Sequence, residues 1–350
     1  MPYELEREVA RRAVLRACAL CRAVQSSIDQ SGSASKVDRS PVTIADFGSQ
    51  ALINLMLMEH FPTDAVVSEE DSGILRSPEG GEMLKKTLME INRVEPEIKS
   101  DEALTAIDHG KVVGKEEEEG GIRRYWTIDP IDGTKGFLRG AQYSVCLALI
   151  EDGDVVLGVL GCPNLGAQPL SAVGKERGGQ GRQKGQGNGT LFTAIKGQGA
   201  FMRLMDGGQD LPIKVSGVTD PAQSSFVESF DPAHSSRKFS SQVAAILGIT
   251  EQPIRVDSQV KYAAIARGDA AFYLRFPVTK DYREKIWDHA AGYLIVKEAG
   301  GTVTDAKGRD VDFSRGGAHI DLDGIVATNG LVHDRVLDAV QRVLEMVEGA

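Results

Sequence analysis

Two aspartates lie three residues apart in the stretch WTIDPIDGTKGFLRG, with a proline and an isoleucine between them. Asp129 and Asp132 would repel each other at this spacing, so a proton, a basic side chain or a metal ion must offset the repulsion. If the proline ends a strand, the Ile131 carbonyl can point outward and face the same point as both carboxylates. Oxygen ligands of this kind are those that Mg²⁺ prefers. Gly133 permits a tight turn behind the pair, and Thr134 follows with a hydroxyl that could touch a metal-bound water.

Four further acidic residues lie where helices and strands are expected to begin or end. Asp46 is expected at a helix start, Glu69 and Glu70 at a strand end, and Asp288 at the N-cap of another helix. Each has a plain alternative: an isolated Asp at a helix start is most often an N-cap, and two glutamates after a strand often form a solvated loop. The aspartate pair could likewise form an Asx-turn.

The elements that must position these residues follow from hydrophobic periodicity and turn residues. Helices are expected over 3–29, from near residue 46 to before Pro62, over 235–247, 259–268, 287–301 and 331–347. Strands are expected at 65–68, at 123–130 (ending at the proline), in a hairpin over 142–163, and near 192–204, 213–216 and 270–275. The polar stretch 71–124, with its acidic run 116–119, and the Gly-rich stretch 174–190 are expected to be loops.

This mixture of helices, hairpins and strands predicts an α/β (α+β) protein built of layers with mixed sheets. We expect an N-terminal α+β metal-binding domain over residues 1–190 and a C-terminal α/β substrate-binding domain over 191–350. The length of 350 residues is sufficient for both.

Composition narrows the classes of partner. The formal net charge of −10 argues against binding to a nucleic-acid polymer, which needs clustered Lys and Arg. No apolar run is long enough to span a membrane, and three glutamates before residue 10 argue against a mitochondrial presequence, so we expect a cytoplasmic protein. The four cysteines include the pair Cys18 and Cys21, whose plainest interpretation is two small core residues of the first helix.

Four motifs taken together resemble a known family: SPVTIADFGSQALI, VSEEDS, WTIDPIDGTKGFLRG and KIWDHAAGYLIVKEAGG. They look like the signature segments of the Mg²⁺-dependent, lithium-sensitive phosphomonoesterases of the inositol monophosphatase superfamily. The resemblance extends from about residue 5 to about residue 345 and implies a layered αβαβα sandwich. It also implies inhibition by Li⁺ and Na⁺.

The resemblance implies two to three Mg²⁺ ions and assigns their ligands. One ion would be held by Glu69, Asp129 and the Ile131 carbonyl, and a second by Asp129, Asp132 and Asp288. Asp46 and Glu69 would help to place a third. Water activated by the metal would attack a phosphate in line, oriented by Thr134, with Asp46 accepting the proton through that hydroxyl.

Residues 256–277 and the segment DPAHSS resemble the bisphosphate nucleotidase branch of the superfamily. This branch acts on adenosine 3',5'-bisphosphate (PAP), releasing AMP and phosphate in support of sulfate assimilation and salt tolerance, and often acts on the sulfated analogue PAPS. The substrate contacts implied are Gly133, Thr134, His234, Ser258, Lys261, Arg275 and Asp288. The plain alternatives place Lys261 on a helix surface and Arg275 in an ion pair at a strand edge.

Two other functions remain open at this point. An inositol monophosphatase or inositol polyphosphate 1-phosphatase would share the metal site, and a non-catalytic ligand sensor would share only the fold. The sensor is disfavoured because a carboxylate occupies every side-chain metal position. Residues 76–122 and 174–190 match no assignable feature.

Overall fold

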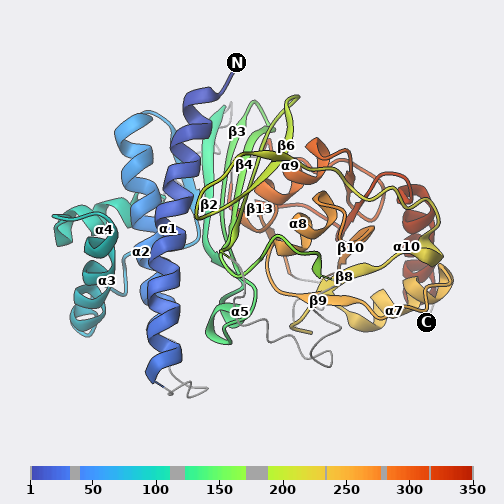
Figure 1. Ribbon diagram of the computed structural model, residues 1–350, viewed down its shortest axis with the longest axis horizontal. Helices are drawn as coiled ribbons and strands as arrows, with labels where there is room; N and C mark the ends of the chain where they lie inside the picture. The colour runs from blue at the N-terminus through green and yellow to red at the C-terminus, as the bar shows by residue number, and fades with distance from the viewer. Residues whose placement is uncertain are drawn as a thin grey trace.

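Five layers of helices and sheets are stacked along the long axis of the molecule (Figure 1). The computed structural model describes residues 2–31, 40–110, 123–170, 188–232, 235–276, 282–314 and 317–348. Helices form the two outer layers and the central layer, and the two sheets lie between them. The αβαβα sandwich expected from the resemblance is therefore confirmed.

The first sheet has seven strands arranged in chain order. They are β1 (Ala65–Ser68), β2 (Arg124–Asp132), β3 (Ser144–Glu151), β4 (Asp154–Cys162), β5 (Thr190–Ile195), β6 (Gly199–Leu204) and β7 (Leu211–Pro212). Only β1 and β2 are parallel, and the other neighbours pair antiparallel. The expected hairpin is β3–β4, and its two-residue turn at Asp152 and Gly153 has the positive φ angles typical of such turns.

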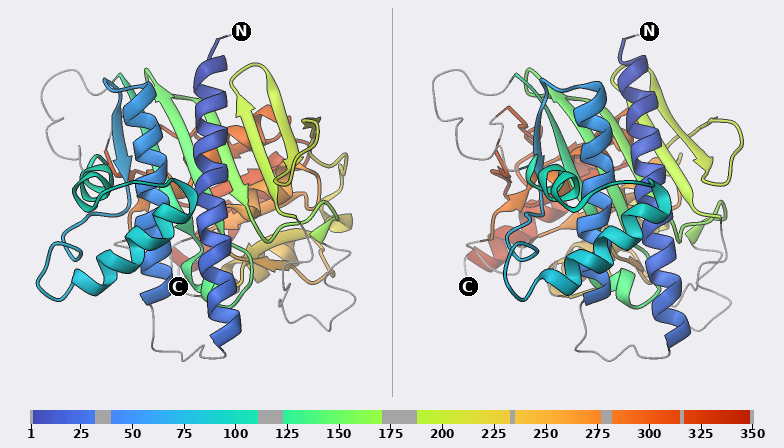
Figure 2. Two further views of the ribbon diagram at one scale, coloured as in Figure 1. Left: turned by 60° about the vertical axis from the view of Figure 1, so that its left-hand side comes forward. Right: turned by 90° about the vertical axis from the view of Figure 1, so that its left-hand side faces the viewer.

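Helices α1 (Glu4–Ser31) and α2 (Ser40–His60) lie side by side across the outer face of this sheet (Figure 2). Helices α3 (Gly81–Val94) and α4 (Ser100–Asp108) pack on α2 from outside. All four cysteines are free and buried, which agrees with the interpretation of Cys18 and Cys21 as core residues.

The second sheet has five strands in the order β12 (Thr302–Thr304), β14 (Ile325–Thr328), β10 (Phe272–Arg275), β8 (Phe226–Ser229) and β9 (Ile254–Val256). A short ribbon of β11 (Glu284–Lys285) and β13 (His319–Ile320) lies apart from it. Helices α7 (Arg237–Ile246) and α10 (His333–Glu348) contact each other in the outer layer (Figure 1). Three short helical elements lie in the connections between strands and helices: α5 (Thr134–Leu138), η1 (Pro221–Gln223) and η2 (Ile286–Asp288).

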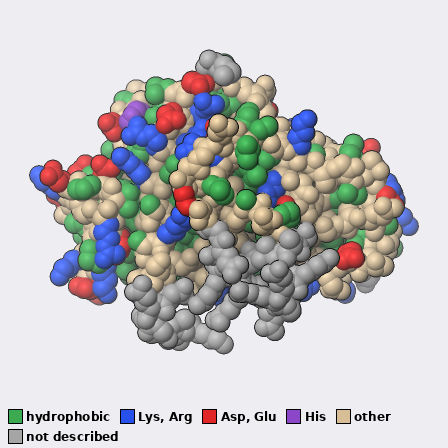
Figure 3. Space-filling model, in the orientation of Figure 1, with side chains coloured by type: hydrophobic (Ala, Val, Ile, Leu, Met, Phe, Trp, Pro, Cys, Tyr) green, Lys and Arg blue, Asp and Glu red, His purple; other side chains and the backbone are tan. Residues whose placement is uncertain are grey.

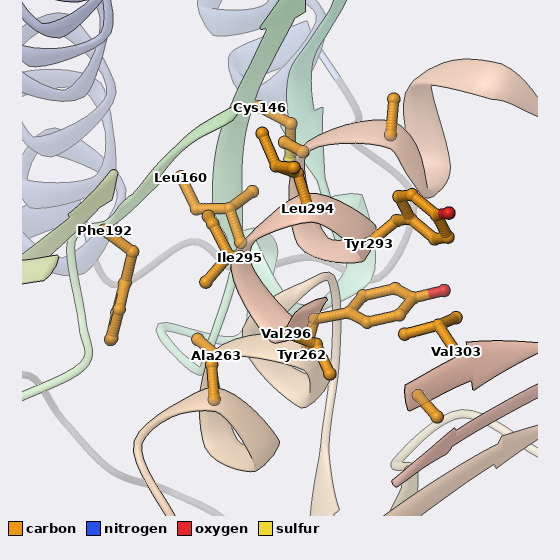
Figure 4. Packing of buried hydrophobic residues seen from close by; sticks show 14 of the residues in the cluster. Cys146, Leu160, Phe192, Tyr262, Ala263, Tyr293, Leu294, Ile295, Val296 and Val303 are labelled. Atoms are coloured by element: carbon orange, nitrogen blue, oxygen red, sulfur yellow. The ribbon is translucent and has the colours of Figure 1, made fainter. Parts of the chain in front are cut away.

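The central layer consists of α8 (Val260–Ala266) and α9 (Ala290–Glu298). Every residue of α9 from 290 to 296 is buried, as expected of a helix that has a sheet on each side. Its side chains meet Leu160 of β4, Phe192 of β5 and Ala263 of α8 in one core (Figure 4). This layer therefore holds the two sheets at a fixed separation.

Several expected boundaries were wrong. Helix α2 begins at Ser40 and not near residue 46, because Ser-Pro is itself a favourable helix start. The stretch 71–124 contains α3 and α4, whose apolar residues recur every three or four positions among polar ones. No strand forms at 213–216, where the chain has only the two-residue β7 just before. The acidic run 116–119 lies outside the described residues.

The boundary expected near residue 190 falls within the first sheet, which continues through β7 to Pro212. The assignment of separate metal-binding and substrate-binding domains stays a prediction. On the face seen in Figure 3, side chains of both charge signs are interspersed over the end where α1 to α4 lie. Within the described residues, no helix combines the length and the apolar character that a membrane span requires.

A tight contact between β4 and α9 predicts an effect on stability. A methyl group added at Gly158 of β4 would lie 2.8 Å from the Ala291 carbonyl oxygen and 3.2 Å from its Cα atom. Because this neighbour is backbone, Gly158→Ala should lower the free energy of unfolding by about 1–3 kcal/mol. Gly81→Ala, where nothing lies within 4 Å, is the matched control. Equal urea denaturation midpoints for the two variants would contradict this packing.

Candidate active site

The strand β2 carries both opening aspartates through an irregularity at Pro130. Residues three apart on a regular strand point to opposite faces of a sheet. Here the register between β2 and β3 shifts between Asp129 and Asp132, so that three steps on β2 match two on β3. The strand thus continues through Pro130 to Asp132, and the expectation that it stops at the proline was wrong. A bulge leaves an extra residue unpaired, which is where a residue without an N–H is tolerated.

The bulge brings the two aspartates to the same side of the sheet. Trp126, Ile128 and Ile131 lie in the core under α1 and α2. The intervening Asp129, and Asp132 beyond the bulge, are left to face the central helix layer. One carboxylate oxygen from each lies within 4.8 Å of one from Asp288 in η2. Asp288 belongs to a 3₁₀ turn whose cap position makes no side-chain hydrogen bond, so its interpretation as a helix N-cap was wrong.

Two further carboxylates approach from the helical side. Glu69 follows β1, and because β1 runs parallel to β2, both strands end at the same edge of the sheet. Asp46 lies inside α2, is 7% exposed, and is therefore not an N-cap. Gln50 of α2 fixes the segment after β1, since its side chain both accepts from and donates to the Glu70 backbone at 3.0 and 2.7 Å.

The raised pKa values of these carboxyl groups show that their negative charges are unfavourable without a bound cation. Burial, together with neighbouring carboxylates, raises the pKa of Asp46 and of Asp129 well above the ordinary range. Burial and Asp288 raise the pKa of Glu69 to about 8. Burial and Asp288 also raise the pKa of Asp132 to about 7, against the opposing influence of Lys261 and Arg275. Two such charges repel by about 3–4 kcal/mol at an effective dielectric constant near 20.

The donor set fits a hard divalent ion. The Oδ1 atom of Asp129 is buried and has no hydrogen-bond partner among the described residues. An oxygen in that state costs free energy unless a cation or donor satisfies it. Carboxylates from Glu69, Asp129, Asp132 and Asp288 are the oxygen ligands that Mg²⁺ takes. The Ile131 carbonyl as a ligand stays a prediction.

The turn behind the aspartates meets the start of α8. Gly133 has a φ of 90°, and a Cβ atom at that position would lie 3.0 Å from the Ser258 Cβ atom. The Gln259 backbone N–H donates to the Asp132 carboxylate. Thr134, the first residue of α5, is exposed. These contacts place Gly133 and Ser258 beside Asp132, and Thr134 follows Gly133 directly in the sequence.

Both predicted cations lie beside the carboxylates. Lys261 is 4% exposed, so its alternative placement on a helix surface was wrong; its Nζ donates to the Ser258 carbonyl at 2.7 Å. Arg275 is also buried and makes an ion pair, but it lies on β10, in the middle of the second sheet and not at its edge. Its Nη2 atom lies 3.0 Å from Asp288. His234 lies outside the described residues.

Sequence reasoning missed a set of residues that support the site. Gln259 links the central helices, because its side chain donates to the Trp287 carbonyl at 2.7 Å and accepts from Gly292 N–H at 2.8 Å. Glu284 and His289 are each 1% exposed. The one available signal was that His289 lies inside the KIWDHAAG motif and that Glu284 directly precedes this motif.

Glu284, Asp288 and His289 form a second close group of possible metal ligands. Arg275 already lies against this group, 2.7 Å from a Glu284 oxygen and 3.0 Å from Asp288. Burial opposes ionisation, but the His289 hydrogen bond and the Arg275 charge lower the pKa of Glu284 to about 2. The guanidinium therefore supplies the positive charge here, and no metal ion is needed to explain this second group.

The chain is a layered sandwich with a group of buried carboxylates between its sheets. Comparison with known proteins shows which family has these features. The model of the inositol monophosphatase family matches residues 3–345. The chain belongs to the inositol monophosphatase family.

Curated relatives narrow the class further. The chain is 46% identical to a 3'(2'),5'-bisphosphate nucleotidase of Oryza sativa, over 98% of this chain and 96% of that protein. It is 44% identical to a 3'(2'),5'-bisphosphate nucleotidase of Emericella nidulans, over 99% of this chain and 100% of that protein.

Solved structures agree on the fold. An inositol monophosphatase from Anabaena superimposes with a TM-score of 0.59 at 19% identity, covering 97% of this chain and 96% of that one. CysQ from Bacteroides thetaiotaomicron superimposes with a TM-score of 0.58 at 19% identity, covering 94% and 98%.

The raised pKa values predict how Mg²⁺ affects stability at different pH. A carboxyl group whose pKa is higher in the folded chain holds its proton longer when folded, so its contribution to stability falls as pH rises. For Glu69 this loss spans pH 4.5 to about 8. Mg²⁺ has fewer protons to displace at high pH. At one fixed Mg²⁺ concentration, about a hundred times the dissociation constant at pH 8.5, Mg²⁺ should stabilise the fold by about 2.7 kcal/mol at pH 8.5 and by clearly less at pH 6.

Thermal melts with chelator and with excess Mg²⁺, at both pH values, measure this difference. Choline chloride at matched ionic strength is the control. A melting-temperature increment that is equal at both pH values, or larger at pH 6, would contradict the assigned protonation.

Proposed function

We propose that the protein is a Mg²⁺-dependent phosphatase that hydrolyses the 3'-phosphate of PAP to release AMP and phosphate. The proposal is supported by full-length relatives that are named bisphosphate nucleotidases. The structural observation that carries it is the placement of two buried cations, Lys261 and Arg275, beside a group of buried carboxylates. A substrate with two phosphates needs cations of the protein for the phosphate that the metals do not hold.

Glu69, Asp129, Asp132 and Asp288 are the side chains that would hold Mg²⁺, with Asp46 contributing to a third ion. When bound, the ions would neutralise the phosphate, lower the pKa of water and stabilise the leaving oxygen. Phosphoryl transfer depends mainly on positioning and charge stabilisation, so a nucleophile from the protein is not required.

The chain's own residues would orient the reactants. The Thr134 hydroxyl would hold the attacking water, and Asp46 would accept its proton through that hydroxyl. Burial and neighbouring acids raise the pKa of Asp46, which suits a group that must take up a proton. Backbone N–H groups of Gly133 and Thr134 would hold phosphate oxygens at the turn after β2.

The remaining substrate contacts would come from the start of α8 and from β10. Ser258 lies next to Gly133, Lys261 donates to the Ser258 carbonyl, and His234 is assigned to this set by resemblance alone. Arg275 uses its Nε and Nη2 atoms for Glu284, Asp288 and Tyr282. Arg275 would act on the substrate chiefly through its positive charge, which these contacts hold beside Asp288.

Substrate range, inhibition and location are finer predictions. PAPS, which carries a sulfate on the second phosphate of PAP, is a further candidate substrate. Inhibition by Li⁺ and Na⁺ and a cytoplasmic location stay predictions. Hydrolysis of inositol 1-phosphate or an inositol polyphosphate is the second candidate, because it would use the same carboxylates.

Phosphate release from PAP and from inositol 1-phosphate, measured side by side with Mg²⁺ and then with added Li⁺, tests the proposal. Fast, Li⁺-inhibited release from PAP is expected. Preference for inositol 1-phosphate would keep the metal site but overturn the substrate assignment. Absence of release from every bisphosphate tested would restore the sensor interpretation.

Asp129→Asn should lower kcat for PAP by roughly 10³-fold or more, since a shared metal ligand contributes several kcal/mol to the transition state. The fold should survive, because the change removes one of several mutually repelling buried charges. Asp310→Asn, an exposed carboxylate paired with Lys297, is the matched control and should keep full activity. Full activity in Asp129→Asn would refute the metal mechanism.

Lys261→Met keeps the buried aliphatic volume and removes the charge. If Lys261 holds the second phosphate, the KM for PAP should rise roughly 10- to 100-fold, as expected for a hydrogen bond to a charged group. Hydrolysis of adenosine 3'-phosphate, which lacks that phosphate, should change little. Lys297→Met is the control. An equal loss with both substrates would show that Lys261 acts on the fold or the metals instead.

A further inference from the structure

A buried chain of polar side chains leads from α8 to the carboxylate Asp288. The Tyr262 hydroxyl lies 2.8 Å from His289 Nδ1, and His289 Nε2 lies 3.0 Å from Glu284 Oε2. Glu284 Oε1 accepts from Arg275 Nε at 2.9 Å, and Oε2 lies 2.7 Å from Arg275 Nη2. The same Nη2 donates to Asp288 at 3.0 Å.

The charges of these hydrogen-bonded side chains decide how readily Asp288 can bind a cation. One guanidinium is shared between two carboxylates, Glu284 and Asp288, so the three groups together keep one negative charge. Without the Glu284 charge, Arg275 and Asp288 would form a neutral pair, and the arginine would compete with any other cation for that carboxylate. The two-bond contact with Glu284 also fixes the plane of the guanidinium.

Glu284 is itself held in one position. An ionised carboxylate only accepts hydrogen bonds, so His289 Nε2 donates to it. Tyr262 cannot swing away from His289, because its ring packs against α9 at Gly292, where an added Cβ atom would lie 2.4 Å from it. Tyr273 contacts the Tyr262 ring edge-on, with centroids 5.3 Å apart.

We propose that Glu284 is a positioning residue that acts through Arg275 to keep Asp288 oriented and accessible for a divalent cation, with His289 and Tyr262 holding Glu284 in place. The proposal rests on the proposed function in taking Asp288 as a metal ligand. Supporting residues of this kind commonly change metal affinity or activity by roughly 10- to 100-fold.

The test is a direct titration of the full chain with Mn²⁺, followed by the electron paramagnetic resonance signal of the free ion, without substrate. Glu284→Gln should raise the dissociation constant for Mn²⁺ roughly 10- to 100-fold. The Mg²⁺ concentration for half-maximal PAP hydrolysis should rise by a similar factor, and kcat at saturating Mg²⁺ should recover most of its value.

Glu228→Gln is the matched control. Glu228 is also a buried glutamate, with its side chain 4% exposed, and it accepts from Arg255 at 2.8 Å on a neighbouring strand. Its loss should lower the melting temperature and leave Mn²⁺ affinity unchanged. Unchanged Mn²⁺ affinity in Glu284→Gln, with only a lower melting temperature, would overturn the proposal.

Tyr262→Phe decides the matter if Glu284→Gln does not fold, because it keeps the packed ring and removes only the hydroxyl. A smaller rise in the Mn²⁺ dissociation constant, in the same direction, is expected. Wild-type Mn²⁺ affinity in a folded Tyr262→Phe variant would then overturn the role proposed for the hydrogen-bonded residues Tyr262, His289 and Glu284. A wild-type protein that binds Mn²⁺ but does not hydrolyse PAP would refute the proposed function alone, since the affinities would still report on Glu284.

Discussion

Repulsion between buried carboxylates is the constraint on which the rest of the structure depends. Asp129, Asp132 and Asp288 come within 4.8 Å of one another, and Glu69 and Asp46 add their charges from the other side. Such an arrangement opposes folding unless protons or cations accompany it. The hydrophobic core around these carboxylates must therefore stabilise the fold enough to hold them together. The buried helix α9 between the two sheets contributes to this stability.

The five layers also explain why the site is assembled from distant parts of the chain. The parallel pair β1–β2 brings Glu69 and Asp129 to one sheet edge, and η2 delivers Asp288 from the central layer. The second sheet adds Arg275 from β10. Apart from Asp288, the carboxylates thus come from the first sheet and its helices, whereas the cations come from α8 and the second sheet. This separation of charge suits a substrate that spans from metals to a second anionic group.

Supporting interactions give the site its rigidity. Gln259 links Asp132, Trp287 and Gly292, and Gln50 holds the segment that follows β1. Arg275 is shared between a carboxylate of the site and one behind it. Each of these side chains is buried and satisfied, which is how a protein holds charged groups in place without water.

The sequence by itself determined the chemistry and most of the elements. The DPIDGT segment indicated oxygen ligands for a hard cation, and the resemblance of WDHAAG to a family motif added Asp288 to them. The Asp152–Gly153 turn, the α1 periodicity and the β1 strand were predicted from local patterns. Local signals suffice there because turn geometry and amphipathic spacing act within a few residues.

The tertiary structure decided what local patterns could not. The bulge at Pro130 turns Asp129 and Asp132 to the same face, and it exists only against the register of β3. The packing of α2 on α1 and the first sheet buries Asp46 inside the helix, whereas the sequence pattern placed this residue at the helix start. The contacts of Arg275 with Glu284 and of Tyr262 with His289 join residues from different layers. Such contacts depend on the packing of whole sheets and helices, and no spacing within the sequence specifies them.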